Sequence, residues 1–353
     1  MDQERADEAD KPPSLNLSRK QPIVSLEKSV QKEAFLVAQN IFDRLVDKVH
    51  VQVVTDISTC QQLFESFSPK DTVFSTWDFR FAWYNAYKYL PAFFVIYYND
   101  KPVGLLPLWY ENDKKQFRWF GSWWMEESSF WVFNQKYIPL LLALAPERTY
   151  LNAITIDSNL AKILKLEPDD PKYVLDLRNK TSAEEFLIKL KKKQRYNLKR
   201  DYRIIESLRP EIEINNYSSL EELFKLSINR FAEKGEHSDF IDDRRKEAFR
   251  QIIKQAKSYQ VRIIKTKINH QTASLDFAFL YKDCYCAAKC GNNVKAFPGI
   301  GNFINLYQIN EAIQMGFKKI DFLEISYGWK EKIFQSMPLY YFQKGLTKKE
   351  LRE

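Results

Sequence analysis

The stretch KAFPGIGNF, residues 295–303, decides how the second half of this chain is interpreted. Glycine is scarce, with 9 in 353 residues, yet Gly299 and Gly301 lie one residue apart. This spacing is typical of two structures: a tight turn between a strand and a helix, or a loop whose backbone N–H groups bind a phosphate. Position 304 is isoleucine, which excludes a dinucleotide-binding fingerprint, and Asn-Phe after Gly301 excludes a P-loop.

The elements predicted around the loop place it between a strand and a helix. Apolar residues recur at helical spacing after Asn302, which is the predicted N-cap, and Gly316 is the predicted C′ residue of that helix. Short polar turns before the loop predict a β-meander with strands at 261–267, 274–281 and 284–290. A strand at 318–325 follows the helix, so the order is strand, Gly-x-Gly loop, helix, strand.

The chain before this region predicts further strands and helices. Residues 1–30 are polar and are expected to form a mobile tail. Helices are predicted at 31–48, 76–87, 182–206, 218–233 and 242–257. Strands are predicted at 51–54, 117–123, 149–156, 173–177 and 212–215, with a hairpin over 92–112.

Composition indicates a folded protein without a membrane span. Apolar residues make up 45% and charged residues 28% of the chain. The longest apolar run, at 138–145, is too short to cross a bilayer, and the charged N-terminus lacks the apolar core of a secretory signal. We therefore expect a cytoplasmic protein.

The positive charge is concentrated in one segment. The net charge is +8, and residues 189–203 alone carry eight basic residues and one acidic residue. Such a segment is either a solvated helix face or a binding site for a phosphate, a nucleotide or RNA. Three of its residues, Arg195, Asn197 and Arg200, are candidate substrate-binding residues, and Lys330 is a further candidate contact.

The cysteines give little support for a metal. Cys284, Cys286 and Cys290 form C-x-C-x3-C, but the usual C-x-x-C spacing is absent. Cys284 and Cys286 would lie on one face of a strand, where buried thiols are common. We expect no metal site.

Three carboxylates are candidates for a role in a reaction. Glu324, at the end of the predicted strand, is the first candidate for a general base, and Asp321 is the second. Their spacing of three places them on opposite faces of a strand, and Asp321 has the alternative of a backbone hydrogen bond. Asp276 lies in an apolar strand, where a carboxylate must be paired or face a cleft, and we predict that it binds substrate.

Four segments carry a resemblance to a known family. They are 98-YNDKPVGLLPLWYE-111, 190-LKKKQRYNLKRDYRIIE-206, 297-FPGIGNFI-304 and 320-IDFLEISYGWKEKIF-334. The last three resemble a K-x-x-R-x-N-x-R-R helix, an S-P-G-x-L-L loop and a D-F-x-x-G-x-x-x-Y-K-x-x-F strand and tail. In these motifs the chain resembles the GNAT acyltransferases of the BioF2-like, CelD (BcsL)-type group, which is related to the FemAB peptidyltransferases. Trp329 replaces the family tyrosine, and Phe297 replaces a small residue.

The resemblance implies a fold and a reaction. The fold would be α/β (α+β), with two fused GNAT-like units at 31–175 and 176–353, each a mixed, mostly antiparallel sheet flanked by helices. The second unit would carry the active site, where an amine attacks the thioester of acyl-CoA, with acetyl-CoA the expected donor. The acceptor would be an amine-bearing small molecule, sugar or peptide. The donor pyrophosphate would bind Lys295, Pro298, Gly299, Ile300, Gly301 and Asn302.

Two other functions stay open at this point. FemAB relatives use aminoacyl-tRNA as donor, and the basic segment 189–203 would suit tRNA. A non-catalytic protein that keeps the fold and binds anions or nucleic acid is the third possibility. It would gain support if Glu324→Gln and Asp276→Asn left the cellular function intact.

Overall fold

The part of the chain that contains the Gly-x-Gly loop forms a seven-stranded sheet in the order β14-β8-β13-β12-β11-β10-β9. The computed structural model of the protein describes residues 48–325, 328–347 and 350. In this second sheet β12 and β13 pair in parallel, and the other neighbouring strands pair antiparallel. Its strands are β8 (Lys172–Asp176), β9 (Glu211–Ile214), β10 (Gln260–Ile268), β11 (Gln271–Tyr281), β12 (Cys284–Asn292), β13 (Lys319–Glu324) and β14 (Gln335–Met337).

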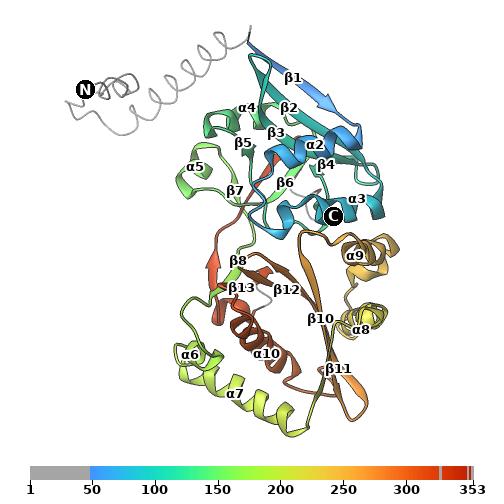
Figure 1. The fold of residues 1–353 in the computed structure, drawn as a ribbon, viewed down its shortest axis with the longest axis vertical. Helices are drawn as coiled ribbons and strands as arrows, with labels where there is room; N and C mark the ends of the chain where they lie inside the picture. Colours follow the sequence, from blue (N-terminus) through green and yellow to red (C-terminus); the bar gives the residue numbers. More distant parts are fainter. Residues whose placement is uncertain (1–47, 326–327, 348–349, 351–353) are drawn as a thin grey trace, which may run out of the picture. The chain divides into compact units, whose positions relative to one another are not determined.

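Helices cover both faces of the second sheet (Figure 1). The sheet lies between α8 and α9 on one side and α10, α6 and α7 on the other. Alternate residues of β11 explain this arrangement, because Phe277 contacts Phe249 of α9 while Ala278 and Leu280 join a core with α10. The helices are α6 (Ala183–Leu187), α7 (Lys192–Ser207), α8 (Leu220–Ala232), α9 (Asp243–Gln255) and α10 (Ile300–Gln314).

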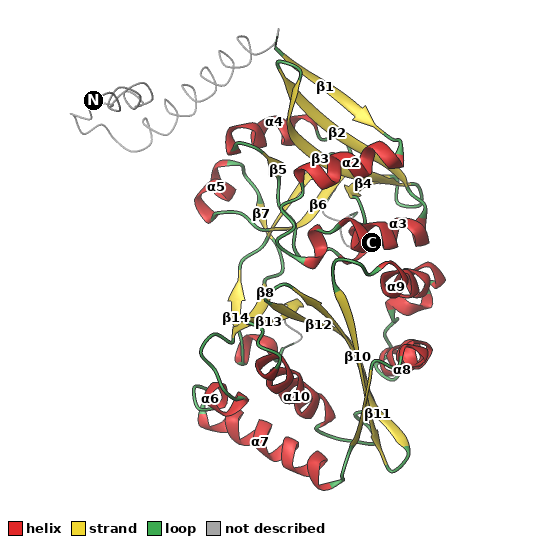
Figure 2. Ribbon diagram, viewed as in Figure 1, coloured by secondary structure: helices red, strands yellow, loops and turns green. Residues whose placement is uncertain are grey.

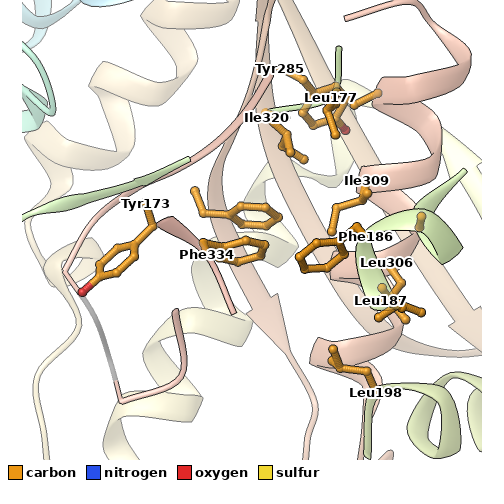
Figure 3. Close-up of a cluster of buried hydrophobic side chains, with 14 of the residues drawn as sticks. Tyr173, Leu177, Phe186, Leu187, Leu198, Tyr285, Leu306, Ile309, Ile320 and Phe334 are labelled. Atoms are coloured by element: carbon orange, nitrogen blue, oxygen red, sulfur yellow. The ribbon is translucent and has the colours of Figure 1, made fainter. Parts of the chain in front are cut away.

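The core under α10 is rich in aromatic and aliphatic side chains (Figure 3). Phe322 of β13 stacks on Phe334 with ring centroids 4.3 Å apart, and Phe334 stacks on Phe186 of α6. Leu306 and Ile309 of α10 complete this layer. The family-like segment 320–334 therefore anchors the end of β13 in the core.

The first sheet has the order β1-β2-β3-β4-β6-β15-β7, and β5 pairs with β3 (Figure 2). β4 and β6 pair in parallel, as β12 and β13 do in the second sheet. The strands are β1 (Val49–Val54), β2 (Leu90–Tyr98), β3 (Lys101–Glu111), β4 (Gln116–Trp119), β5 (Trp131–Val132), β6 (Thr149–Ile154), β7 (Glu167–Pro168) and β15 (Tyr340–Lys344). The helices are α2 (Ile57–Phe67), α3 (Trp77–Tyr87), α4 (Ile138–Leu144) and α5 (Ser158–Ile163).

The chain crosses from one sheet to the other twice. It enters the second sheet at β8, and it returns to the first sheet at β15, which pairs with β6 and β7. Residues 51–353 group as one compact unit, which contains the second sheet and all of the first sheet except the first two residues of β1. The two predicted boundaries, 31–175 and 176–353, stay predictions.

The predicted class of fold is confirmed, with two mixed sheets flanked by helices. The β-meander, the hairpin and the strand after the Gly-x-Gly helix lie where the sequence predicts them. Gly316 has a φ of 78° directly after the helix, as expected for a C′ residue. The predicted tail 1–30 and nearly all of the predicted helix 31–48 lie outside the described residues.

Three local predictions were wrong. The predicted helix 182–206 is two helices, because the backbone of Lys191 is extended, with a ψ of 143°. Ile188, in the turn between the two helices, is exposed. The predicted strand 117–123 ends at Trp119, because Gly121 turns the chain with a φ of 75°. The N-cap of α10 is Gly299 rather than Asn302.

No helix in the described part of the chain combines the length and the apolar composition that crossing a membrane requires.

Candidate active site

The parallel strands β12 and β13 separate part of the way along their length. They pair from Cys284 and Lys319 to Cys286 and Asp321, and the pairing ends there. β12 then continues to Asn292 as an inner strand of the sheet, yet its residues 287–289 are partly exposed and Cys290 is exposed. We call the region between residues 287–290 of β12 and 322–324 of β13 the β12–β13 opening. Backbone groups of β12 that face it have no ladder partner on β13.

A bulge and a kink border this opening. The register of β12 against β11 shifts so that Ala288 is an extra residue between Ala287 and Lys289. On the other side, Leu323 and Ile325 adopt left-handed φ values of 62° and 65°. Such a backbone costs on the order of 1–3 kcal/mol per residue, and this kind of strain clusters at functional sites.

The lysine in the tail after β13 holds the kinked strand in place. The Lys330 ammonium donates hydrogen bonds to the carbonyl oxygens of Phe322 at 2.5 Å and Glu324 at 2.7 Å. Burial lowers the pKa of Lys330, and the carboxylate of Glu126 opposes that shift. Its role as a substrate contact stays a prediction, since these carbonyls already bind its ammonium.

Glu324 lies beside a second acidic residue, Glu126, from the loop after β4. The Glu126 carboxylate accepts hydrogen bonds from the backbone N–H of Glu324 at 2.7 Å and from Trp124 Nε1 at 2.7 Å. Glu324 Oε1 is buried and has no hydrogen-bond partner among the described residues. Burial raises the pKa of both carboxyl groups, and the charge of Glu126 raises that of Glu324 further. The pair therefore retains a proton where an isolated glutamate would not.

Asp321 is engaged in an ion pair. Its carboxylate contacts the Lys172 ammonium at 2.9 Å and accepts a hydrogen bond from the backbone N–H of Leu323. Lys172 also forms an ion pair with Glu127. Asp321 is buried, with 2% of its surface exposed. The backbone hydrogen bond is the alternative that the sequence suggested for Asp321, and its catalytic role stays a prediction.

The N-terminus of α10 contacts an acidic residue of α7. Gly299 has a φ of 94° and no side chain caps the helix. Asn302 donates from Nδ2 to the carboxylate of Asp201 at 2.7 Å, and a Cβ on Gly299 would lie 2.9 Å from Asp201 Cβ. Asp201 thus places a negative charge at the positive end of α10, where an anionic ligand would also be stabilised.

The other loop residues differ in exposure. Lys295 and Pro298 are exposed, while Ile300 is fully buried in a core with Ile205 and Phe303. Only the backbone of Ile300 could therefore contact a cofactor. Gly301 lies against Asn292, which a Cβ would approach to 3.3 Å.

Asp276 lies in a buried polar cluster beneath α10. Four polar atoms have no hydrogen-bond partner among the described residues, namely Asp276 Oδ2, Ser274 Oγ, Thr266 Oγ1 and Asn292 Oδ1. The strand registers place Thr266, Ser274 and Asn292 side by side, with Asp276 in the next row beside Cys290. Burial raises the pKa of Asp276 to about 7. Groups of this kind are normally satisfied by ordered water or a polar ligand.

The basic residues of α7 form an exposed stripe. Lys192, Lys193 and Arg200 are exposed, and Tyr196 has 65% of its surface exposed among them. Arg195 donates to the carbonyl of Ile188, and Arg200 pairs with Asp201. Asn197 is half-buried on the same helix.

The structure brings only some of the predicted residues together. Glu324, Asp321 and Lys330 gather at the kinked end of β13, and Arg200 and Asn302 meet through Asp201. Sequence reasoning missed Glu126, Glu127, Lys172 and Asp201. No local pattern in the sequence distinguishes the adjacent Glu126 and Glu127 from other pairs of glutamates, such as Glu221 and Glu222 in α8.

Comparisons with known proteins agree with this architecture. Residues 192–331 match the sequence model of the acetyltransferase (GNAT) domain, which is less than half of the chain. No curated protein matches the sequence. A structure of FemX is similar with a TM-score of 0.53 at 8% identity, covering 83% of this chain and 98% of that one.

Two further structures share the fold. A conserved protein of unknown function from Bacteroides thetaiotaomicron has a TM-score of 0.52 at 12% identity, covering 83% of this chain and 99% of that one. A tandem GNAT protein from the clavulanic acid biosynthesis pathway has a TM-score of 0.51 at 8% identity, covering 85% and 100%. At such identities the likeness concerns the fold alone. Residues 192–331 therefore match the GNAT acetyltransferase domain, within a two-sheet fold that a tandem GNAT protein shares.

Proposed function

We propose that the protein is an N-acyltransferase that moves an acyl group from acyl-CoA to an amine by direct attack. The observation that carries the proposal is the β12–β13 opening with the Glu126–Glu324 pair beside it. An opening between parallel strands offers free backbone groups to a donor. The carboxylate pair offers a proton acceptor at the end of one of those strands.

The residues would act as follows. Unpaired N–H groups of β12 would stabilise the negative charge that develops on the carbonyl oxygen of the donor. The Glu126–Glu324 pair would accept the proton that the attacking amine loses as its nitrogen bonds to the acyl carbon, and the CoA thiolate would leave. The fixed kink at Leu323 would keep Glu324 in position, since Lys330 binds the carbonyls on both sides of it.

Calorimetric titration of the full chain with acetyl-CoA and CoA tests donor binding. Release of free thiol with a panel of amines, amino sugars and peptides then tests transfer. Glu324→Gln and Glu126→Gln should each slow transfer by about 100-fold or more while keeping donor binding, and the exposed Glu236→Gln should change neither. Absence of binding to any CoA ester would refute an acyl-CoA donor.

A second candidate function has a specific observation in its favour. Asp201 already occupies the positive end of α10, which weakens that helix as a site for the pyrophosphate of CoA. The stripe of Lys192, Lys193, Tyr196 and Arg200 on α7 suits a nucleic-acid backbone with base stacking. An aminoacyl-tRNA donor would use the same carboxylate pair.

A filter-binding assay with charged tRNA separates the two donors. An RNA donor predicts an affinity that falls steeply with salt and is weakened by a Lys192→Glu, Lys193→Glu double variant. The same variant should leave binding of a CoA ester nearly unchanged if acyl-CoA is the donor.

A further inference from the structure

Two thiols and a carboxylate meet at the closed end of the β12–β13 opening. Cys284 and Cys286 lie on one face of β12 with their sulfur atoms 3.4 Å apart. Asp321 is directly opposite Cys286 in the parallel ladder. The two sulfurs and a carboxylate oxygen of Asp321 all lie within 4.8 Å of one another.

These separations suit ligands of one metal ion. Zinc binds thiolate at about 2.3 Å and carboxylate at about 2.0–2.2 Å, so two sulfurs in a tetrahedral site lie roughly 3.8 Å apart. The placement of the ligands on two strands also explains why the usual C-x-x-C spacing is not required. The sequence lacks C-x-x-C, but the third ligand comes from β13, thirty-five residues after Cys286 in the chain.

The charges around the cluster allow a metal ion to replace the two thiol protons. Lys172 now neutralises Asp321, and it also binds Glu127, so it keeps a partner when Asp321 turns to a metal. A divalent ion that displaces one proton from each thiol to solvent leaves the net charge of the buried group unchanged. Binding therefore adds no uncompensated charge to a buried site.

We propose that Cys284, Cys286 and Asp321 form a binding site for a thiophilic divalent metal ion, with Zn²⁺ as the best fit. Its fourth position is open to water. The ion would tie β12 to β13 at the last rung before the strands separate. This proposal does not rest on the proposed acyltransferase function.

The experiment uses the full chain after chelator treatment and reduction. Titration with Cd²⁺ is followed by thiolate-to-metal absorbance, and Zn²⁺ affinity is measured by competition with a chromophoric chelator. The expected result is one equivalent of metal, a rise in Tm, and release of roughly two protons measured across buffers. Cys284→Ser, Cys286→Ser and Asp321→Asn should each weaken binding at least tenfold.

The chain offers matched controls. Cys60→Ser removes a buried thiol elsewhere, and Cys290→Ser removes an exposed thiol of the same strand, so both should keep the site intact. If Cys286→Ser does not fold, Cys284→Ser decides, because that side chain is only half-buried. Absence of stoichiometric thiolate absorbance, or its persistence in the Cys284→Ser variant, would overturn the proposal.

Discussion

The carboxylate of Glu126 accepts a hydrogen bond from the backbone N–H of Glu324, across 198 residues of sequence. This contact joins the loop after β4 to the kinked end of β13. Burial raises the pKa of both carboxyl groups, and the charge of Glu126 raises that of Glu324 further. The loop of the first sheet is thus part of the candidate site on the second.

The carboxylate pair should give the reaction an unusual pH dependence. Only the deprotonated pair accepts a proton from the amine, and both pKa values are raised. We expect kcat/KM to rise with pH through a value above the ordinary range of glutamate. Glu324→Gln should lower kcat by about 100-fold or more and abolish that rise. A pH–rate profile that stays flat above pH 5 in the wild-type protein would contradict this assignment.

Ionisation of Asp276 should oppose folding, so the contribution of this residue to stability should fall between acid and neutral pH. Its pKa of about 7 lies above the ordinary 3.8, so ionisation opposes folding. The loss of unfolding free energy caused by this ionisation is absent below the ordinary pKa, grows as pH rises to 7, and is constant above it. Relative to wild type, Asp276→Asn should therefore gain up to about 4 kcal/mol in the free energy of unfolding between pH 4 and 8.

Urea unfolding at a series of pH values measures this difference. The exposed Glu236→Gln serves as control and should follow the wild-type protein at each pH. A difference that does not change with pH would show that Asp276 ionises normally.

Gly299→Ala should test how closely α7 approaches the start of α10. The left-handed φ of 94° costs a non-glycine residue about 1–2 kcal/mol, and the new Cβ would also collide with Asp201. Gly235→Ala is the matched control, because Gly235 has a φ of 72° but no atom within 4 Å of the added Cβ. We expect Gly299→Ala to lose more unfolding free energy than Gly235→Ala, as measured in urea. Equal losses would mean that α7 moves away at little cost.

Asp201→Asn should open the N-terminus of α10 to anions. Loss of the carboxylate removes about 0.3–1 kcal/mol of favourable interaction with the helix dipole, and the freed position becomes more attractive to phosphate. We expect affinity for CoA and for inorganic pyrophosphate to rise about two- to fivefold by calorimetry. The exposed Asp176→Asn should leave both unchanged. Unchanged affinity in Asp201→Asn would place the donor phosphates away from α10.

The sequence predicted the elements that depend on local pattern. Strands 274–281 and 284–290, the Gly-x-Gly turn and the C′ residue Gly316 follow from periodicity and glycine chemistry, and the structure confirms them. Glu324 could be chosen because it ends a strand in a family-like segment.

Long-range contacts were beyond local pattern. Nothing near Glu126 in the chain indicates Glu324, and nothing near Asp201 indicates Gly299, because both relationships are created by packing between distant elements. The break between α6 and α7 has the same origin. Phe186 is held in the core with Phe334, and α7 must then turn to lie along α10.

The return of β15 to the first sheet bears on the order of folding during synthesis. β6 and β7 leave the ribosome early, but the strand that joins them is translated about 170 residues later. Until then the first sheet has two unjoined edges exposed to aggregation or to a chaperone. The two halves are therefore completed together, and neither should be obtainable as a stable fragment cut near residue 175.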